Sequence, residues 1–392
     1  MNLLAIQEAL RDANLDGWLF YDHHRRDPIA YRVLGIDPVI CSRRWYYLIP
    51  QQGEPAKLVH RIEAHNLDGL PGKTNLYSSW REQQEGLTGL LEGQKRVAMQ
   101  YSALNNIPYV GLVDAGTIEL VRSCGLEVVS SADLVQQFEA CWSAEQLQSH
   151  LAAGTVVHDA VRTAFASIRT AVTQSNKISE YDVQQTMLRV FEANGVITDE
   201  APCVAVNAHS GDPHYSPLAE NSAEVHAGDF VLLDVWGKQK QRGAVYFDIT
   251  WTGFVGESVP EPYAKVFAAV REARDAAIAL VQEAFATGRE LRGFQVDDAA
   301  RAVIDRHGFG AQFVHRTGHS IGQDVHGNGA NMDNFETHDD RRILPNTCFS
   351  IEPGIYRNDF GVRSEVNVFA GTDGARVTGE IQSAVVPILA GY

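Results

Sequence analysis

The sequence predicts a two-domain α+β protein, on three observations. Its 392 residues exceed the usual size of a domain with a single hydrophobic core, so two domains are expected. Apolar residues make up 45% of the chain and charged residues 21%, as in ordinary globular proteins. Short apolar runs alternate with helical patterns up to residue 140, and longer helical patterns with acid-bearing apolar runs follow. We expect a small α/β domain over residues 1–140 and a second domain over residues 141–392, in which helices cover one face of an antiparallel sheet.

The first domain is predicted to begin with an amphipathic helix, because Leu3, Ile6 and Leu10 fall on one helical face. Apolar runs rich in aromatic and β-branched residues then predict strands at 18–21, 45–49, 57–60 and 96–100. Helical spacing predicts helices near 86–92 and 111–123. Such an alternation of strands and helices is typical of a small α/β domain.

The second domain is predicted to begin with a long helix. Ser143 and Gln146 form a capping-box pattern, and apolar residues then recur every three or four positions up to Ile168. A second helix is expected to begin at Ser179 and to end at Gly195, where glycine allows the backbone to leave the helix. The remaining helices are expected at 261–285 and 295–307, the latter closed by Gly308.

Composition excludes several classes of partner. A formal net charge of -16 argues against nucleic acid and against an anionic membrane surface. The five cysteines are scattered and form no CxxC pair, as expected of reduced thiols in the cytosol. The N-terminus lacks the pattern of a signal peptide, and no segment approaches the roughly 18 apolar residues that span a bilayer. We therefore expect a cytoplasmic protein without a nucleic-acid or membrane partner.

The most informative feature is a set of potential metal ligands in the second domain. In chain order they are Asp234, Asp248, His319, Glu352 and Glu365. Each acid ends or lies inside an apolar, strand-like run, where a lone carboxylate is costly to bury and several would repel one another. Divalent cations remove both costs, and the charges of four carboxylates nearly cancel those of two dications. The pattern therefore predicts a two-metal hydrolase. Oxygen-rich ligands with one imidazole favour manganese, with cobalt, zinc and iron as alternatives.

Histidines are concentrated near these acids, since eight of the fourteen fall between residues 209 and 338. His315 and His319 are four residues apart, but the intervening Thr-Gly disfavours a helix and the glutamate of an H-E-x-x-H zinc motif is missing. A strand or loop that directs several imidazoles toward one site fits better. His150 and His158, on the first long helix, are expected to be structural.

The ligands lie in short motifs with a fixed order. These are Leu-Leu-Asp234, Asp248-Ile-Thr250, Thr317-Gly-His319-Ser-Ile-Gly322, Val325-His326, Ile351-Glu352-Pro-Gly-Ile-Tyr356 and Gly361-Val-Arg363-Ser-Glu365. Together they resemble the motifs of the pita-bread metallopeptidases, the group of prolidase (Xaa-Pro dipeptidase), aminopeptidase P, methionine aminopeptidase and creatinase. The resemblance extends from about residue 145 to the end. The first domain and Pro213-His214-Tyr215 are similar to the prolidase and aminopeptidase P branch.

This resemblance implies a pita-bread domain, with helices on a curved antiparallel sheet, that binds two divalent ions. Asp234 and Asp248 would bind metal, Asp248 as a bridge. His319 and Glu352 would hold one ion, and Glu365 would bridge both. The implied activity is hydrolysis of Xaa-Pro dipeptides, in which two ions about 3.5–4 Å apart activate water and polarise the carbonyl.

The resemblance also implies roles beyond metal binding. Glu352 would accept a proton and deliver it to the prolyl leaving nitrogen. His214 and His326 would hydrogen-bond the substrate carbonyl or the oxyanion that forms from it. His315 would line the proline pocket or support the ligands, and Tyr356 and Arg363 would contact substrate or orient the carboxylates. His209, His226 and His338 are expected to be solvated or structural.

The sequence departs from the family pattern at several positions. Asp234 and Asp248 are farther apart than is usual, and the extra residues, 237–242, are polar and basic. Trp236 stands where a small residue is usual, Trp251 where arginine is usual, and Ser320 replaces a common glycine. None of these changes removes a ligand. Two added indoles and one lost guanidinium predict a less charged and more apolar pocket.

Alternatives to an Xaa-Pro dipeptidase remain at this point. Aminopeptidase P activity on longer peptides is the nearest. A metal-free amidinohydrolase of the creatinase type and a non-catalytic binding protein on the same fold are also alternatives, but both would be expected to lack some of the ligands. A homodimer is expected for a two-domain enzyme of this kind.

Overall fold

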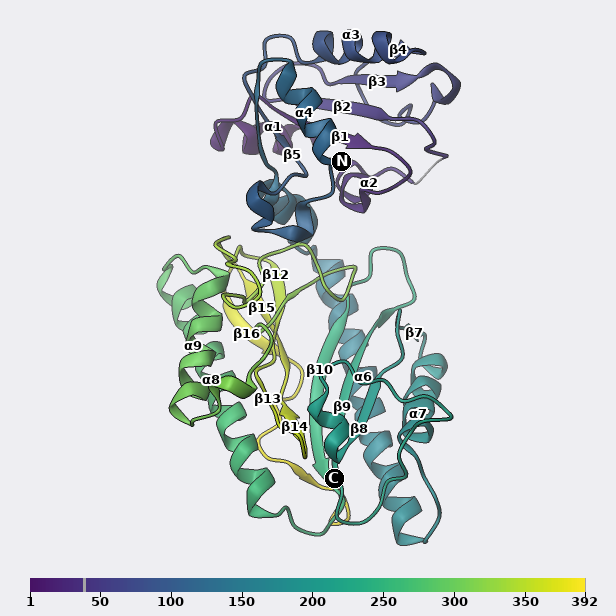
Figure 1. Cartoon of the computed structure of the whole chain (residues 1–392), viewed down its shortest axis with the longest axis vertical. Helices are drawn as coiled ribbons and strands as arrows, with labels where there is room; N and C mark the ends of the chain where they lie inside the picture. Colours follow the sequence, from purple (N-terminus) through teal and green to yellow (C-terminus); the bar gives the residue numbers. More distant parts are fainter. Residues whose placement is uncertain (38–39, 392) are drawn as a thin grey trace. The chain divides into compact units, whose positions relative to one another are not determined.

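The computed structural model describes residues 1–37 and 40–391. Two units can be distinguished, Met1–Glu139 and Ala140–Tyr392, and each has its own hydrophobic core. Figure 1 shows the helices and strands of both units. Within the described ranges, no helix is both long and apolar enough to cross a lipid bilayer.

The first unit is built on a mixed six-stranded sheet with the order β4-β3-β2-β1-β5-β6. Its strands are β1 (Gly17–Asp22), β2 (Trp45–Pro50), β3 (Ala56–His60), β4 (Lys73–Tyr77), β5 (Arg96–Met99) and β6 (Glu127–Ser130). The strands predicted from the sequence are β1, β2, β3 and β5. Strands β4 and β6 were not predicted, because they lie at the two edges of the sheet, expose half or more of their residues and so lack a long apolar run.

Helices cover both faces of this sheet, as expected for an α/β domain. They are α1 (Leu3–Asp12), α2 (Pro28–Leu34), α3 (Trp80–Leu90), α4 (Ala115–Ser123) and α5 (Ala132–Val135), with short helical turns η1 (Arg61–Glu63), η2 (Ala103–Asn105), η3 (Pro108–Val110) and η4 (Gln136–Ala140). On one face, α1 and α2 bury apolar side chains against Trp18 and Phe20. On the other face, α3 and α4 pack against Leu19 and Tyr46.

The second unit contains the long helices that the sequence predicts. They are α6 (Ala144–Thr173), α7 (Glu180–Ala193), α8 (Glu261–Thr287) and α9 (Gly293–Arg306), with short turns η5 (Asn207–Gly211) and η6 (Gly310–Gln312). The predicted capping box between Ser143 and Gln146 is present at the start of α6. Gly195 and Gly308 follow α7 and α9 with φ of 65° and 80°, a left-handed conformation that glycine adopts without strain.

The strands of the second unit form three small sheets. They are β7 (Val196–Ile197), β8 (Cys203–Val206), β9 (Phe230–Gln239), β10 (Phe247–Phe254), β11 (Ser320–Ile321), β12 (Thr347–Ile351), β13 (Gly354–Tyr356), β14 (Gly361–Arg363), β15 (Val366–Gly371), β16 (Gly374–Thr378) and β17 (Val386–Pro387). One sheet has the order β17-β10-β9-β7, with β8 also pairing with β9. A second has the order β11-β12-β15-β16, and β13 pairs with β14 in a hairpin.

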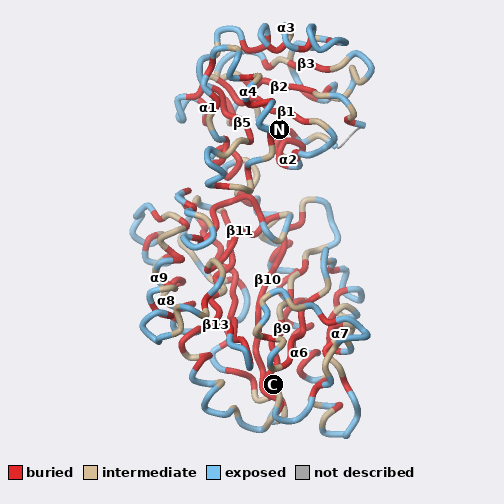
Figure 2. The backbone as a smooth tube through the Cα atoms, in the orientation of Figure 1, coloured by how far each residue is buried: buried red, intermediate tan, exposed pale blue. Residues whose placement is uncertain are grey.

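Each of the two larger sheets is covered by its own pair of helices. α6 and α7 pack on β8, β9 and β10, while α8 and α9 pack on β12, β14 and β15. In Figure 1 the strands lie between the two helix pairs, and Figure 2 shows the strands buried along most of their length. The predicted arrangement of helices on one face of a sheet is therefore present twice, and the strand pairs are antiparallel except for β10 and β17. Acidic residues lie on the faces that the helices leave uncovered.

His150 illustrates how the first helix pair is held to its sheet. Its buried ring bonds the carbonyl oxygen of Tyr246 through Nδ1 at 2.6 Å and Oγ1 of Thr378 through Nε2 at 2.7 Å. Burial lowers the pKa of His150 from its ordinary 6.5 to about 4. His158 also lies on α6, and it accepts a hydrogen bond from the backbone N–H of Glu380 at 3.1 Å. Both histidines are structural, as predicted.

The lowered pKa of His150 predicts a pH-dependent stability. Above pH 6.5 the imidazole is neutral in both folded and unfolded chains, so its buried bonds contribute fully. Below pH 6.5 the unfolded chain binds a proton that the folded ring takes up only near pH 4, so this stability is lost as the pH falls. We expect His150→Gln to reduce the loss in unfolding free energy between pH 7 and pH 5 by about 2 kcal/mol. Urea unfolding at both pH values checks this, and an unchanged loss in the variant would contradict it.

Candidate metal centre

The two aspartates reach the site because strands β9 and β10 alternate their side chains. Leu233, Val235 and Ile249 point into the core beneath α6 and α7. Asp234 and Asp248 point to the opposite face, on neighbouring strands whose register pairs Asp234 with Thr250. An apolar strand that is buried on one face thus presents its carboxylates on the other.

The second sheet supplies the other three ligands from the ends of its strands. His319 lies just before β11, Glu352 just after β12, and Glu365 just before β15. The side chain of Ser350 links the first two, because its Oγ accepts a hydrogen bond from the backbone N–H of His319 and donates one to Oε1 of Glu352, both at 2.9 Å. The backbone N–H of Glu365 donates to the carbonyl oxygen of Thr250 at 3.3 Å, which joins the second sheet to the first.

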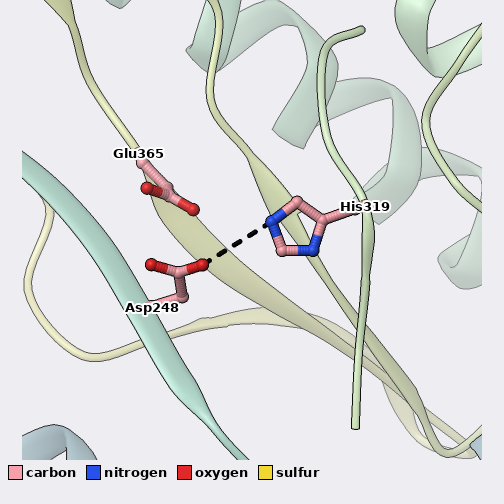
Figure 3. A group of neighbouring side chains, drawn as sticks. All are labelled: Asp248, His319 and Glu365. Carbon is pink, nitrogen blue, oxygen red and sulfur yellow. Dashed lines mark ion pairs between the residues drawn. The ribbon is translucent and has the colours of Figure 1, made fainter. Parts of the chain in front are cut away.

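These side chains converge on one point between the sheets. Candidate ligand atoms of Asp248, His319 and Glu365 all lie within 4.8 Å of one another (Figure 3). Nε2 of His319 lies 3.6 Å from Oδ2 of Asp248 and 3.3 Å from Oε1 of Glu352. The hydroxyl of Thr250 bridges Asp234 and Glu365, at 3.1 and 2.8 Å. The structure therefore brings all five predicted ligands together.

The electrostatics of the cluster are those of a cation site. Burial, and then the charges of Asp234 and Glu352, raise the pKa of Asp248 well above its usual range. Burial, and then the charges of Asp248 and Glu352, do the same to the pKa of Glu365. Burial also opposes ionisation of Glu352, but neighbouring His319, His315 and Arg363 outweigh it and lower its pKa.

Two buried carboxylate oxygens without a hydrogen-bond donor indicate whether these residues fit divalent ions. Oδ1 of Asp248 and Oε1 of Glu365 are buried and accept no hydrogen bond from any residue that the structure describes. A buried acceptor without a donor costs about 1–3 kcal/mol, and more when it is charged. Such oxygens beside an imidazole are a suitable ligand set for a divalent ion. The residues therefore fit the metal centre that the sequence predicts.

Arg363 and Tyr356 form a network behind the ligands. The guanidinium of Arg363 pairs with Asp234 through Nη2 and donates to Oγ1 of Thr250 and to the hydroxyl of Tyr356, both at 2.9 Å. Nε2 of His315 lies 2.7 Å from the same Tyr356 hydroxyl, and burial lowers the pKa of His315 to about 4. Of the two roles considered for Tyr356 and Arg363, these contacts favour orientation of the carboxylates.

The two histidines expected to contact substrate occupy different settings. The ring of His326 packs edge-on against His319, with centroids 4.4 Å apart, and remains exposed to solvent. The neighbouring His319 contributes most to lowering the pKa of His326, to about 4. His214 is exposed, and its backbone N–H donates to Oδ1 of Asp212 at 3.0 Å. The hydrogen bonds and ion pairs of the described residues do not join His214 to the ligand cluster.

The two unusual tryptophans lie on opposite sides of the sheet. Trp236 faces the site, opposite Asp248 in the β9–β10 ladder, and its Nε1–H donates to Oδ1 of Asp199 at 3.1 Å. Trp251 is buried in the core under α6, where its ring meets His158 edge-on at 5.9 Å. The expectation of two added indoles in the pocket is therefore wrong for Trp251, because β10 alternation turns it away.

Residues 237–242 lie at the tip of the β9–β10 hairpin, where Gly237 pairs with Phe247 and the chain turns after Gln239. Strand β9 continues through Gln239, and its last residues pair with β7. The amine of Lys238 lies 4.6 Å from the ring centroid of Tyr246. The extra residues therefore lengthen β9 before the chain turns toward β10.

Several supporting residues were missed by sequence reasoning. Oδ1 of Asn367 accepts the backbone N–H of Asp248 at 3.0 Å, across the two sheets. Asp297, fully buried on α9, accepts hydrogen bonds from both N–H and O–H of Thr317, at 2.9 and 2.6 Å. The backbone carbonyl of Thr317 in turn accepts the N–H of Glu352 at 2.7 Å. A buried acid on an otherwise apolar helical face was the one signal that could have indicated Asp297.

Comparisons with known proteins bear on the family and the fold of the chain. The sequence model of metallopeptidase family M24 matches residues 148–371, more than half of the chain. The Xaa-Pro dipeptidase of Lactobacillus helveticus is 29% identical over 223 residues, which cover 56% of this chain and 55% of that protein. The chain spans about half the length of the curated relatives it matches.

Solved structures extend the likeness to almost the whole chain. Dipeptidase PepE from Mycobacterium ulcerans has a TM-score of 0.72 at 22% identity, covering 98% of this chain and 96% of that one. An X-Pro aminopeptidase from Thermotoga maritima has a TM-score of 0.63 at 17% identity, covering 98% and 99%. At these identities the likeness establishes the fold. The predicted α+β pita-bread fold is confirmed.

The buried oxygen of Glu365 that lacks a hydrogen-bond donor predicts that bound metal stabilises the folded protein. Mn²⁺ that binds only the folded chain should stabilise it by about 2.7 kcal/mol at a concentration 100 times its Kd. We expect Glu365→Gln, which removes one charge with little change of shape, to weaken Mn²⁺ binding tenfold or more. Thermal melts of metal-free protein with increasing Mn²⁺ measure this. The matched control is Glu257→Gln, an exposed acid; equal shifts in both variants would contradict the site.

Proposed function

This chain belongs to metallopeptidase family M24, and from that membership we propose that it is a metal-dependent peptidase that hydrolyses Xaa-Pro dipeptides. The observation that carries the proposal is the convergence of four carboxylates and one imidazole from two separate sheets. The naming of a relative as an Xaa-Pro dipeptidase supports the substrate class. The intact ligand set weighs against a metal-free amidinohydrolase and against a non-catalytic binding protein.

The ligand set also defines what metal would supply. Two divalent ions would be held by five side chains: Asp234, Asp248, His319, Glu352 and Glu365. When bound, they would polarise the scissile carbonyl and activate a water molecule. We propose manganese, because four oxygen donors outnumber the single nitrogen, with cobalt, zinc and iron as alternatives.

Glu352 is the proposed proton carrier. Its lowered pKa keeps it ionised at neutral pH, so it can accept a proton from the attacking water. It can then deliver that proton to the prolyl nitrogen, which is a poor leaving group until it is protonated. Ser350 fixes Oε1 by donating its hydroxyl hydrogen at 2.9 Å, and Arg363 lies 3.9 Å from Oε2.

The histidines bind the reacting carbonyl in this proposal. With a pKa of about 4, His326 is neutral at pH 7, so it offers one N–H to the carbonyl oxygen or to the oxyanion that forms from it. His214 would contribute a second donor from the η5 segment. His315, held by the Tyr356 hydroxyl, would line the proline pocket.

A second candidate is an Xaa-Pro aminopeptidase that acts on longer peptides, because one structural neighbour is an X-Pro aminopeptidase. The chemistry is the same in both. The two activities differ in whether the site accepts a substrate in which a further residue follows the proline.

We also propose a cytoplasmic homodimer. All five cysteines are free thiols, as expected in a reducing compartment. Cyclic dimers are the commonest assemblies among soluble proteins that form homo-oligomers. Light scattering coupled to gel filtration measures the mass, and a monomer at micromolar concentration would contradict the dimer.

The substrate class is tested with a peptide panel. We expect purified protein with added Mn²⁺ to release proline from Xaa-Pro dipeptides, and to cleave Xaa-Pro-Yaa peptides at least tenfold more slowly. Amino-acid analysis of the products measures both rates. Faster cleavage of tripeptides would favour the aminopeptidase, and no release from either class would refute Xaa-Pro hydrolysis.

The role of Glu352 has its own test. Replacement by Gln keeps an oxygen for the metal but removes the proton acceptor, so kcat should fall by about 10²-fold or more. Metal content, measured by elemental analysis on the same preparation, should stay close to that of the wild type. Retained activity would remove Glu352 from proton transfer.

A further inference from the structure

A buried carboxylate outside the ligand cluster is completely engaged by neighbours. Glu180, the first residue of α7, has no solvent exposure. Its Oε1 accepts the backbone N–H of Val206 at 2.7 Å and bonds Nδ1 of His209 at 2.8 Å. Its Oε2 accepts the hydroxyl of Tyr215 at 2.6 Å and the backbone N–H of Ala223 at 2.7 Å. Four donors offset the high cost of burying this charge.

All four donors come from one stretch of chain, residues 206–223. His214 lies inside this stretch, next to Tyr215, and is itself exposed. The rings of His209 and Tyr215 stack on each other, with centroids 4.3 Å apart, so the two side chains brace each other at the carboxylate. Glu180 therefore fixes the chain on both sides of His214 and leaves the imidazole free.

The same stretch is fixed on its other side to the β13–β14 hairpin. Oγ of Ser210 accepts the backbone N–H of Gly361 at 2.9 Å. The contact is close, because a Cβ at Gly361 would lie 2.0 Å from the carbonyl oxygen of Ser210. The hairpin carries Tyr356 and Arg363, which contact His315 and Asp234. The stretch that bears His214 is thus clamped between α7 and the residues behind the ligands.

Helix stability alone does not account for Glu180. The start of α7 already has a capping box, in which Ser179 accepts the backbone N–H of Asp182 and Asp182 accepts that of Ser179. Glu180 points away from this cap and into the 206–223 stretch. A carboxylate is also the only side chain that accepts four hydrogen bonds without donating any.

We propose that Glu180 is a positioning residue that holds His214 in place to bind the carbonyl of the peptide substrate. This inference rests on the proposed function, in which His214 donates to that carbonyl. Glutamine at this position would keep the shape but replace one acceptor oxygen with a donor amide. The backbone N–H of Val206 or of Ala223 would then lose its acceptor, and the bond to His209 or Tyr215 would have to reverse its direction. The stretch would then loosen while the metal ligands stay in place.

The experiment is a double-mutant cycle between Glu180→Gln and His214→Ala in the full-length, manganese-loaded protein. We expect Glu180→Gln alone to lower kcat/KM for an Xaa-Pro dipeptide tenfold or more, with unchanged metal content. In the His214→Ala background the same change should cost less than twofold, because the residue that it positions is already gone. Asp182→Asn, two residues away in the capping box, is the matched control and should leave kcat/KM within twofold.

Amide hydrogen exchange provides a second readout that does not need activity. In Glu180→Gln we expect backbone amides of residues 206–223 to exchange at least tenfold faster, with little change around His319 and Glu352. Additive losses in the cycle, or unchanged exchange in the stretch, would overturn the proposal. If the wild type cleaves no Xaa-Pro peptide, the proposed function fails, and the exchange comparison alone decides whether Glu180 holds this stretch.

Discussion

The concentration of negative charge between two sheets is the constraint on which the second unit depends. Asp248 and Glu365 are 5% and 3% exposed, and each has one oxygen without a hydrogen bond from the described residues. Folding without cations would leave these acids protonated or repelling one another. Divalent ions would convert that cost into binding energy. The same requirement explains why Thr250, Ser350 and Arg363 each contact one or more ligands instead of the core.

The sequence predicted those parts of the site that lie on regular strands. Period-two alternation places Asp234 and Asp248 opposite the core-facing Leu233 and Ile249, so apolar runs that contain an acid were a reliable signal. The start of helix α6 at Ser143 was equally predictable, because local side-chain hydrogen bonds decide where a helix begins. Long helices were predicted from their apolar periodicity, and their ends from the glycines that follow them.

The remaining differences between prediction and structure have separate causes. Trp251 was an avoidable error, because the alternation of β10 already places a residue three positions after Asp248 on the opposite face. Helix α3 begins at Trp80, and the predicted start near residue 86 was too late, because the first turns of the helix are polar and show no apolar periodicity, although Ser79 and Glu82 form a capping box. By contrast, the four donors to Glu180 are spread over residues 206–223, and only folding brings them together.

The fit between buried carboxylates and divalent ions is tested most directly by anomalous X-ray diffraction from crystals grown with Mn²⁺. Two anomalous peaks are predicted in each chain, both in contact with the side chains of Asp248 and Glu365, with His319 at one of them. Peaks only at the protein surface, or no peak among these side chains at saturating Mn²⁺, would contradict a two-metal centre.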